Sequence, residues 1–137
     1  MITAIDTNIL LDVLIPNEQF VDRSLTAIEE ASARGSLVVC DPVYAELCSQ
    51  FLSQPDCDRF LDENRIVVER VSREAMWTAS LAWRQYRHRG GRRDRVLADF
   101  IVGAHAFIQA SCLLSRDRGV YGTYFQDLTL IDPSSSL

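Results

Sequence analysis

Short apolar runs alternate along the chain with longer segments in which apolar residues recur every three or four positions. The short runs are apolar on both faces and are bounded by turn or cap residues, which is typical of buried strands. They cover residues 2–5, 37–40, 66–68, 112–114 and 128–131. Strands that alternate with amphipathic helices predict right-handed crossovers and a parallel sheet. We therefore expect an α/β fold, with about five parallel strands and helices on both faces of the sheet.

Several residues mark where the helices begin and end. Gly35 can close the helix predicted over residues 20–34, and Ser72 is a suitable N-cap for a later helix. Asp41 and Pro42 suit the N-cap and the first turn of the helix after the second strand. In a sheet of this kind, ligands bind beyond the carboxyl ends of the strands. Chemistry is therefore expected where the strands end and the next helices begin.

The composition is that of one globular domain. At 137 residues, with 47% hydrophobic and 24% charged residues, the chain can bury an adequate core. We expect one domain over residues 1–132 and a short serine-containing tail over residues 133–137. The amino-terminal segment lacks the features of a signal peptide, and the longest uncharged run, residues 100–115, is too short to span a bilayer. A cytoplasmic protein without a membrane segment is expected.

The cysteine and lysine contents exclude several kinds of site. The four cysteines form no C-x-x-C pair, which argues against a zinc site or a disulfide framework and favours reduced thiols. The chain has no lysine, so neither a P-loop nor any other mechanism that needs an ammonium group is available. The net charge of -5 argues against a protein that coats nucleic acid indiscriminately.

Three acidic residues stand at the ends of predicted strands. Asp6 comes directly after residues 2–5, and Asp117 comes shortly after residues 112–114. Taken singly, each is most simply a helix N-cap or a turn residue. Glu46 lies in the second turn of a helix that leaves the carboxyl end of another strand, although such a glutamate is ordinarily solvated. Together, the three side chains can reach the same edge of the sheet.

Asp99 is harder to explain as an ordinary surface residue. It is the only Asp, Glu, Arg or Lys residue from 96 to 115, in a helix that is apolar nearly all round. We expect this helix to be buried. A carboxylate there needs a partner, and a metal ion is a reasonable one because the chain has no lysine. Gly103, one turn later, would let another chain segment or a substrate come close.

The four acids suit a metal site. Four carboxylates without a basic neighbour would repel one another. Mg²⁺ and Mn²⁺ favour oxygen ligands and would relieve this repulsion, and Mg²⁺ keeps waters available for chemistry. A water acidified by such an ion can attack a phosphodiester. The acids therefore suit metal-dependent phosphodiester hydrolysis.

Four segments resemble the motifs of PIN-domain ribonucleases: AIDTNILL at 4–11, AEL at 45–47, LADFIVGAHA at 97–106 and LSRD at 114–117. They lie in register across essentially the whole chain, which is similar to the VapC toxins of type II toxin-antitoxin pairs. The resemblance implies that the metal-binding, catalytic acids are Asp6, Glu46, Asp99 and Asp117. It further implies that Asn8, as a supporting residue, orients Asp6, and that the Ser115 hydroxyl helps to position the site.

The resemblance also implies a compact α/β domain that binds Mg²⁺ or Mn²⁺ and cuts RNA, frequently transfer RNA or ribosomal RNA. Such proteins often form homodimers and are held inactive by a cognate antitoxin encoded beside them. Asp41 departs from the serine or threonine of many relatives, and we interpret it as a cap. We interpret His105 as a hydrogen-bonded core residue rather than a general base. Trp77, Trp83 and Tyr86 on one basic helix also suit an interface with a protein inhibitor.

Six of the 14 basic residues lie in one stretch immediately before the helix that carries Asp99. A basic stretch of this kind is usually a solvated helix end. Its place beside the predicted site makes contact with the RNA backbone an equally good interpretation, because phosphate contacts supply affinity and orientation. The arginines assigned to RNA binding are Arg84, Arg87, Arg89, Arg92, Arg93 and Arg95.

Two other interpretations are open. A receiver or phosphatase domain also gathers aspartates at strand ends, but receivers normally need a lysine near the site and this chain has none. A catalytically silent PIN-like module would bind RNA or a protein without cutting. The four acids count against that module, but the sequence does not decide turnover.

Overall fold

The computed structural model describes residues 1–90 and 95–134. Its strands are β1 (Ile2–Ile5), β2 (Ser36–Cys40), β3 (Ile66–Glu69), β4 (Cys112–Leu114) and β5 (Leu130–Ile131). Its helices are α1 (Thr7–Leu14), α2 (Val21–Arg34), α3 (Asp41–Cys48), α4 (Gln54–Glu63), α5 (Arg73–His88), α6 (Leu97–Gln109) and α7 (Arg118–Tyr124). The boundary between a domain over 1–132 and a tail over 133–137 stays a prediction, because residues 135–137 lie outside the described part.

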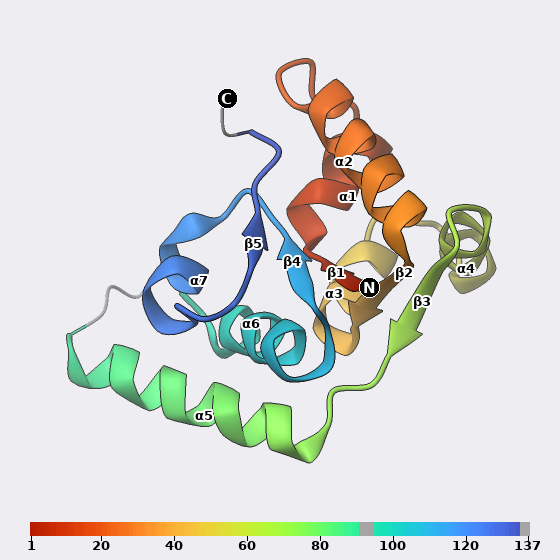
Figure 1. The fold of residues 1–137 in the computed structure, drawn as a ribbon. Helices are drawn as coiled ribbons and strands as arrows, with labels where there is room; N and C mark the ends of the chain where they lie inside the picture. The colour runs from red at the N-terminus through yellow and green to blue at the C-terminus, as the bar shows by residue number, and fades with distance from the viewer. Residues whose placement is uncertain (91–94, 135–137) are drawn as a thin grey trace.

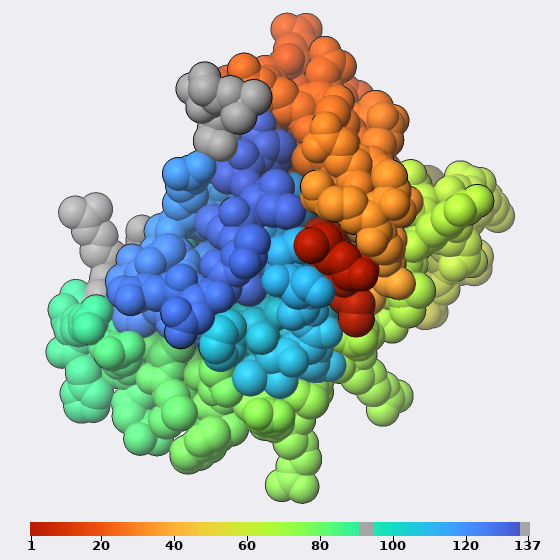
Figure 2. Space-filling view, in the orientation of Figure 1, coloured from red at the N-terminus to blue at the C-terminus, as the bar shows by residue number. Residues whose placement is uncertain are grey.

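The strands form one parallel sheet in the order β3-β2-β1-β4-β5. Helices α1 and α2 lie on one side of this sheet, and α5 and α6 lie on the other (Figure 1). On the face seen in the space-filling view, the blue C-terminal region lies beside the cyan region that precedes it (Figure 2). Helix α7 contacts α6, and β5 contacts β4 and α7. The predicted α/β architecture is confirmed, and the order of the strands brings the ends of β1 and β4 together.

Burial in the sheet follows the position of each strand. The central strands β1, β2 and β4 are buried almost throughout, as their unbroken apolar runs predict. Strand β3 was expected to be buried on both faces, which is wrong: Val67 and Val68 are 60% and 39% exposed. The physical reason is that β3 is an edge strand, paired on one side by β2.

Two of the three predicted helix ends have the expected chemistry. Ser72 caps α5, because its hydroxyl accepts a hydrogen bond from the Ala75 N–H at 3.1 Å. Gly35 ends α2, and a Cβ there would lie 1.9 Å from the Met1 carbonyl oxygen, so only glycine fits this close approach. The interpretation of Asp41 as an N-cap is wrong. Asp41 is the first residue of α3, and its carboxylate accepts a hydrogen bond from the Val71 N–H at 3.3 Å.

An aromatic cluster joins α5, α6 and α7. The rings of Trp83, Tyr86, Phe100 and Tyr124 pack with centroids 5.3 to 5.9 Å apart. The interface with a protein inhibitor predicted for Trp77, Trp83 and Tyr86 stays a prediction, but Trp83 and Tyr86 face α6. Trp77 lies on the other side of α5 and is 60% exposed.

Helix α6 is buried along its middle and exposed at its edges. Gly103 is buried, and a Cβ there would come within 2.6 Å of the Phe125 ring, so the predicted close approach of another segment is confirmed. Leu97 and Phe107 are 43% and 41% exposed, so the helix is less buried than expected. His105 is 1% exposed and lies 2.8 Å from a Glu69 carboxylate oxygen, which confirms its interpretation as a hydrogen-bonded core residue. Among the residues described, no helix is both long and apolar enough to cross a membrane.

Candidate active site

Asp6 stands at the junction of β1 and α1. Its backbone N–H donates to the Leu114 carbonyl of β4 at 3.0 Å, which continues the pairing of the two strands by one residue. Its side chain caps α1, because Oδ1 accepts from the Thr7 N–H at 2.8 Å. Asp6 is 8% exposed. The same residue therefore ends a central strand, begins a helix and presents a nearly buried carboxylate.

Three side chains donate hydrogen bonds to the second carboxylate oxygen of Asp6. Oδ2 accepts from the Ser115 hydroxyl at 2.8 Å, the Tyr121 hydroxyl at 3.0 Å and the Asn8 amide at 3.3 Å. These bonds favour the charged form of the group, but burial outweighs them and raises the pKa of Asp6, with the charge of Asp117 adding to the rise. Asn8 and Ser115 thus lie where the sequence predicts, against Asp6.

Tyr121 is a further residue of the site, and it was not predicted from the sequence. Its hydroxyl is buried against Asp6, and burial followed by the charge of Asp6 raises its pKa well above the usual range. The charges of Asp117 and Asp99 contribute to the same rise. The available signal was its position one helical turn after Asp117 in α7, but tyrosine in a short helix is too common to single out. Tyr121 therefore donates a proton to the Asp6 hydrogen bond and remains neutral.

The Asn8 amide is positioned by Arg116, whose side chain forms an ion pair that was not predicted from the sequence. The Arg116 guanidinium contacts both oxygens of the buried Asp12, at 2.8 and 2.9 Å. The Arg116 backbone N–H donates to Asn8 Oδ1 at 3.1 Å, and this fixes the amide so that its nitrogen faces Asp6 and Ser115. The supporting contacts of Asp6 are therefore anchored to α1 and to the segment after β4.

Asp117 caps α7 and forms an ion pair. Its Oδ1 accepts from the Gly119 N–H at 3.0 Å and from Arg95 Nη2 at 3.1 Å, while Arg95 Nη1 contacts Oδ2. The expectation that the four acids lack a basic neighbour is therefore wrong. The assignment of Arg95 to RNA binding stays a prediction; in this structure its guanidinium contacts Asp117. The separation of 22 residues between the partners hides this contact in the sequence.

The edge of the sheet where β1, β2 and β4 end, together with the first turns of the helices that follow, is here called the rim. Glu46 lies at the rim, in the second turn of α3. Its residue surface is exposed, yet partial burial of the carboxylate raises its pKa, and the charges of Asp6 and Asp99 raise it further. The Thr7 hydroxyl lowers that pKa, although Thr7 Oγ1 is buried without a hydrogen bond of normal geometry. The charges of Asp6 and Asp99 therefore act on the Glu46 carboxylate at this edge of the sheet.

Asp99 has a structural role that the sequence did not predict. It lies in the first turn of α6, half-buried, and its Oδ2 accepts a hydrogen bond from the Val96 N–H at 3.0 Å. The expectation of a buried carboxylate without a protein partner is wrong, because the start of α6 is open to solvent. Asp99 nevertheless contributes to the raised pKa values of Glu46 and Tyr121.

The donor chemistry of these acids fits a divalent cation. The four carboxylates offer oxygen ligands. The charge of Asp117 raises the pKa of Asp6, and the charges of Asp6 and Asp99 raise the pKa of Glu46, as happens when like charges are held together. Within residues 1–90 and 95–134, however, no three His, Cys, Asp or Glu side chains are already close enough to hold a metal ion. The acids thus supply the charge and the atoms of a metal site, while their present positions do not form a ligand shell.

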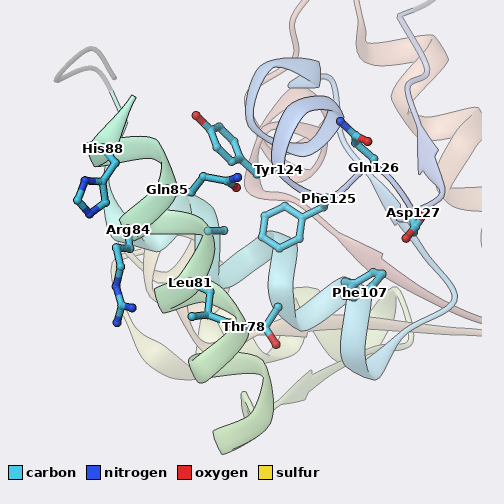
Figure 3. A pocket seen from close by; sticks show the side chains of 11 residues that line it. Thr78, Leu81, Arg84, Gln85, His88, Phe107, Tyr124, Phe125, Gln126 and Asp127 are labelled. Carbon is cyan, nitrogen blue, oxygen red and sulfur yellow. The ribbon is translucent and has the colours of Figure 1, made fainter. Parts of the chain in front are cut away.

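Of the other arginines assigned to RNA, Arg84 and Arg87 lie on α5 and Arg89 is its C-cap residue. Arg84, Arg87 and Arg89 are exposed, Arg87 lies 5.6 Å from the Trp83 ring centre, and Arg89 lies 5.7 Å from that of Tyr124. Arg92 and Arg93 lie outside the described residues. A cavity of about 570 Å³ opens between α5 and the segment after α7, lined by Leu81, Arg84, His88, Phe107, Phe125 and Asp127 among others (Figure 3). None of the four acids lines it, so this hollow is separate from the rim site.

Solved structures with this fold include two VapBC structures and one toxin-antitoxin complex. VapBC-1 from nontypeable Haemophilus influenzae matches with a TM-score of 0.73 and 18% identity, covering 98% of this chain and 100% of that chain. VapBC2 from Rickettsia felis, bound to a DNA fragment from its promoter, matches with a TM-score of 0.72 and 17% identity, covering 96% of this chain and 98% of that chain. A toxin-antitoxin complex from Klebsiella pneumoniae matches with a TM-score of 0.68 and 16% identity, covering 96% of this chain and 97% of that chain. At these identities the likeness concerns the fold.

No match to a curated protein was found. A family model of the PIN domain matches residues 3–126, which include the two central strands that end at Asp6 and before Asp117. Because this match spans most of the sequence and agrees with the parallel sheet and its solved neighbours, the chain belongs to the PIN domain family.

Proposed function

We propose that this PIN domain is a divalent-metal-dependent endoribonuclease, the toxin of a type II toxin-antitoxin pair. The observation that carries the proposal is that Asp6, Glu46, Asp99 and Asp117 follow strands or lie in the early turns of helices at one edge of the sheet, where the charge of Asp117 raises the pKa of Asp6 and the charges of Asp6 and Asp99 raise that of Glu46. Like charges held together in this way destabilise one another, so a cation that binds them is strongly favoured. Membership of the PIN family makes a nuclease the natural use of such a site.

In the proposed mechanism, Asp6 is the fixed ligand and Glu46 the mobile one. Ser115, Tyr121 and Asn8 hold Asp6 in one position, whereas Glu46 is exposed in the second turn of α3. When bound, Mg²⁺ or Mn²⁺ acidifies a water and offsets the charge that develops on the phosphoryl oxygens. The four acidic side chains would hold the ion where it faces a phosphodiester that lies across the rim.

The substrate proposed is single-stranded or looped RNA, such as a segment of transfer RNA or ribosomal RNA. Arg84, Arg87 and Arg89 place positive charge along the exposed side of α5, and we assign them, together with Arg92 and Arg93, to the RNA backbone. Contacts of this kind supply affinity and register rather than base recognition. The rim acids then position the scissile phosphate, and the arginines of α5 position the flanking RNA backbone.

The proposed partners follow from the solved neighbours. Two of them are VapBC complexes and one is a toxin-antitoxin complex, and from these we infer that this chain binds a cognate antitoxin. We further propose that it forms a homodimer and acts in the cytoplasm. A catalytically silent PIN-like module that binds RNA or protein is the alternative. The two are separated by whether the purified chain turns over RNA.

The test is a cleavage assay with purified chain and total cellular RNA. We expect cleavage in Mg²⁺ or Mn²⁺, loss of cleavage in EDTA and recovery when metal is added back. Asp6→Asn should abolish it, whereas Asp22→Asn, the same change at an exposed residue in the first turn of α2, should not. Equal cleavage in EDTA refutes the metal mechanism, and RNA binding without cleavage at any metal concentration favours the silent module.

A further inference from the structure

The Arg95 side chain occupies the carboxylate of Asp117 at two points. Nη2 lies 3.1 Å from Oδ1, and Nη1 contacts Oδ2. Both side chains are about three-quarters withdrawn from solvent, at 28% and 26% exposure. A two-point pair between a guanidinium and a carboxylate is the strong form of this interaction. One of the four proposed metal ligands is therefore already bound by a cation that belongs to the chain.

The backbone beside Asp117 leaves room for this contact. A Cβ at Gly119 would lie 2.7 Å from Arg95 Nη2 and 3.4 Å from Asp117 Oδ1. The backbone of Gly119 is not in the left-handed region, so any residue could adopt it and space is the reason for glycine. A side chain at this position would press against the guanidinium where it meets the carboxylate.

The charge of Arg95 compensates the acids of the rim. Asp117 raises the pKa of Asp6 and, with Asp6, that of Tyr121, so its charge reaches the other site residues. A guanidinium on both Asp117 oxygens offsets part of that charge while the rim acids are not gathered into a ligand shell. A divalent cation bound through Asp117 would need the same oxygen atoms.

We propose that Arg95 is an internal counter-cation that competes with the divalent metal for Asp117. Metal binding then requires the guanidinium to leave the carboxylate, and Arg95 sets how tightly the metal is held. This inference rests on the proposed metal site. The alternative is an ordinary structural ion pair, in which Arg95 stabilises the start of α6 against α7 and has no effect on metal affinity.

Three variants separate these cases. Arg95→Gln removes the competing charge. Gly119→Ala keeps that charge but crowds the guanidinium at its contact with Asp117. Arg118→Gln is the matched control, because it removes an arginine next to Asp117 in sequence whose own ion pair is with Asp132, at 2.7 Å.

The measurement is the Kd of Mn²⁺ for the full chain, by isothermal titration calorimetry at fixed ionic strength and pH. We expect Arg95→Gln to bind Mn²⁺ about tenfold more tightly than wild type, which corresponds to about 1.4 kcal/mol. Gly119→Ala should shift in the same direction by a smaller factor, and Arg118→Gln should change Kd by less than about twofold because it acts only through screened charge. In an Asp117→Asn background, Arg95→Gln should have no effect.

A Kd for Mn²⁺ that is unchanged or weaker in both Arg95→Gln and Gly119→Ala overturns the competition while leaving the proposed metal site intact. Equal tightening by Arg95→Gln and Arg118→Gln also overturns it, since the effect would then come from net charge. If neither wild type nor Arg95→Gln binds Mn²⁺, the proposed metal site and this inference both fall. Binding by Arg95→Gln at concentrations where wild type binds none supports it.

Discussion

Two substitutions at Asp99 separate its charge from its hydrogen bond. Asp99→Asn removes the negative charge but keeps an oxygen that can accept from the Val96 N–H, now accepted at 3.0 Å. Asp99→Ala removes both. The charge of Asp99 contributes to the raised pKa of Glu46, so either change should bring the Glu46 pKa closer to its usual value.

The stability of the two variants should differ in metal-free protein. Asp99→Ala leaves the Val96 N–H without its acceptor at the start of α6, which should cost about 1 kcal/mol and lower the Tm by about 4 °C. Asp99→Asn should leave the Tm unchanged or raise it, because the acceptor stays and a repulsive charge is lost. Both should abolish RNA cleavage, since a neutral side chain is a poor ligand for Mg²⁺ or Mn²⁺.

Thermal melts in EDTA and single-turnover cleavage in Mg²⁺ measure the two effects independently. Cleavage retained by Asp99→Asn would refute the role of Asp99 in the site. A loss of stability in Asp99→Asn equal to that in Asp99→Ala would show that the charge itself holds the start of α6, and that repulsion among the acids is not significant.

Three further outcomes are expected. Tyr121→Phe removes a donor from the buried Asp6 carboxylate and should destabilise metal-free protein by about 1 to 3 kcal/mol at neutral pH; an unchanged melt would contradict the role of that bond. Because the folded-state pKa values of Asp6 and Glu46 lie above their usual 3.8 and 4.5, folded protein holds these protons longer than unfolded protein, so their contribution to stability is present at low pH and is lost as pH rises above this range. Melts in EDTA from pH 4 to pH 8 should show this loss, Mn²⁺ should reverse it, and a slope unaltered by Glu46→Gln would count against it. Replacing Arg84 and Arg87 with Ala should weaken RNA binding and reduce its salt slope by about 0.7 per lost phosphate contact, and an unchanged slope in filter-binding assays would assign α5 to solvent alone.

The sheet could be predicted because local pattern determines it. The central strands β1 and β4 are buried on both faces, and an unbroken apolar run is the direct sequence record of that burial. The exposure of Val67 and the inward position of Trp83 could not be predicted in the same way. Each depends on which neighbour the element meets, an edge in one case and α6 in the other, and a single sequence does not record neighbours.

The site residues likewise differ in whether the local sequence could reveal them. Asp6 and Asp117 could be found from their places after strands, and the Asn8 contact with Asp6 spans only two residues. Tyr121 and Arg95 reach their carboxylates across 115 and 22 residues, so only the assembled fold brings each pair together. The missing information was therefore the internal partners of the acids, and one of these partners, Arg95, carries the charge that the sequence led us to assign to a metal ion alone.

The most direct test of the proposed ribonuclease is to map new 5′ ends in cellular RNA after brief induction of the wild-type chain and of Asp6→Asn at matched protein levels. The account predicts one or a few dominant new ends with the wild type, none of them with Asp6→Asn, and their disappearance when the cognate antitoxin is produced together with the chain. No new ends with folded wild-type protein, or the same ends with both proteins, would contradict it.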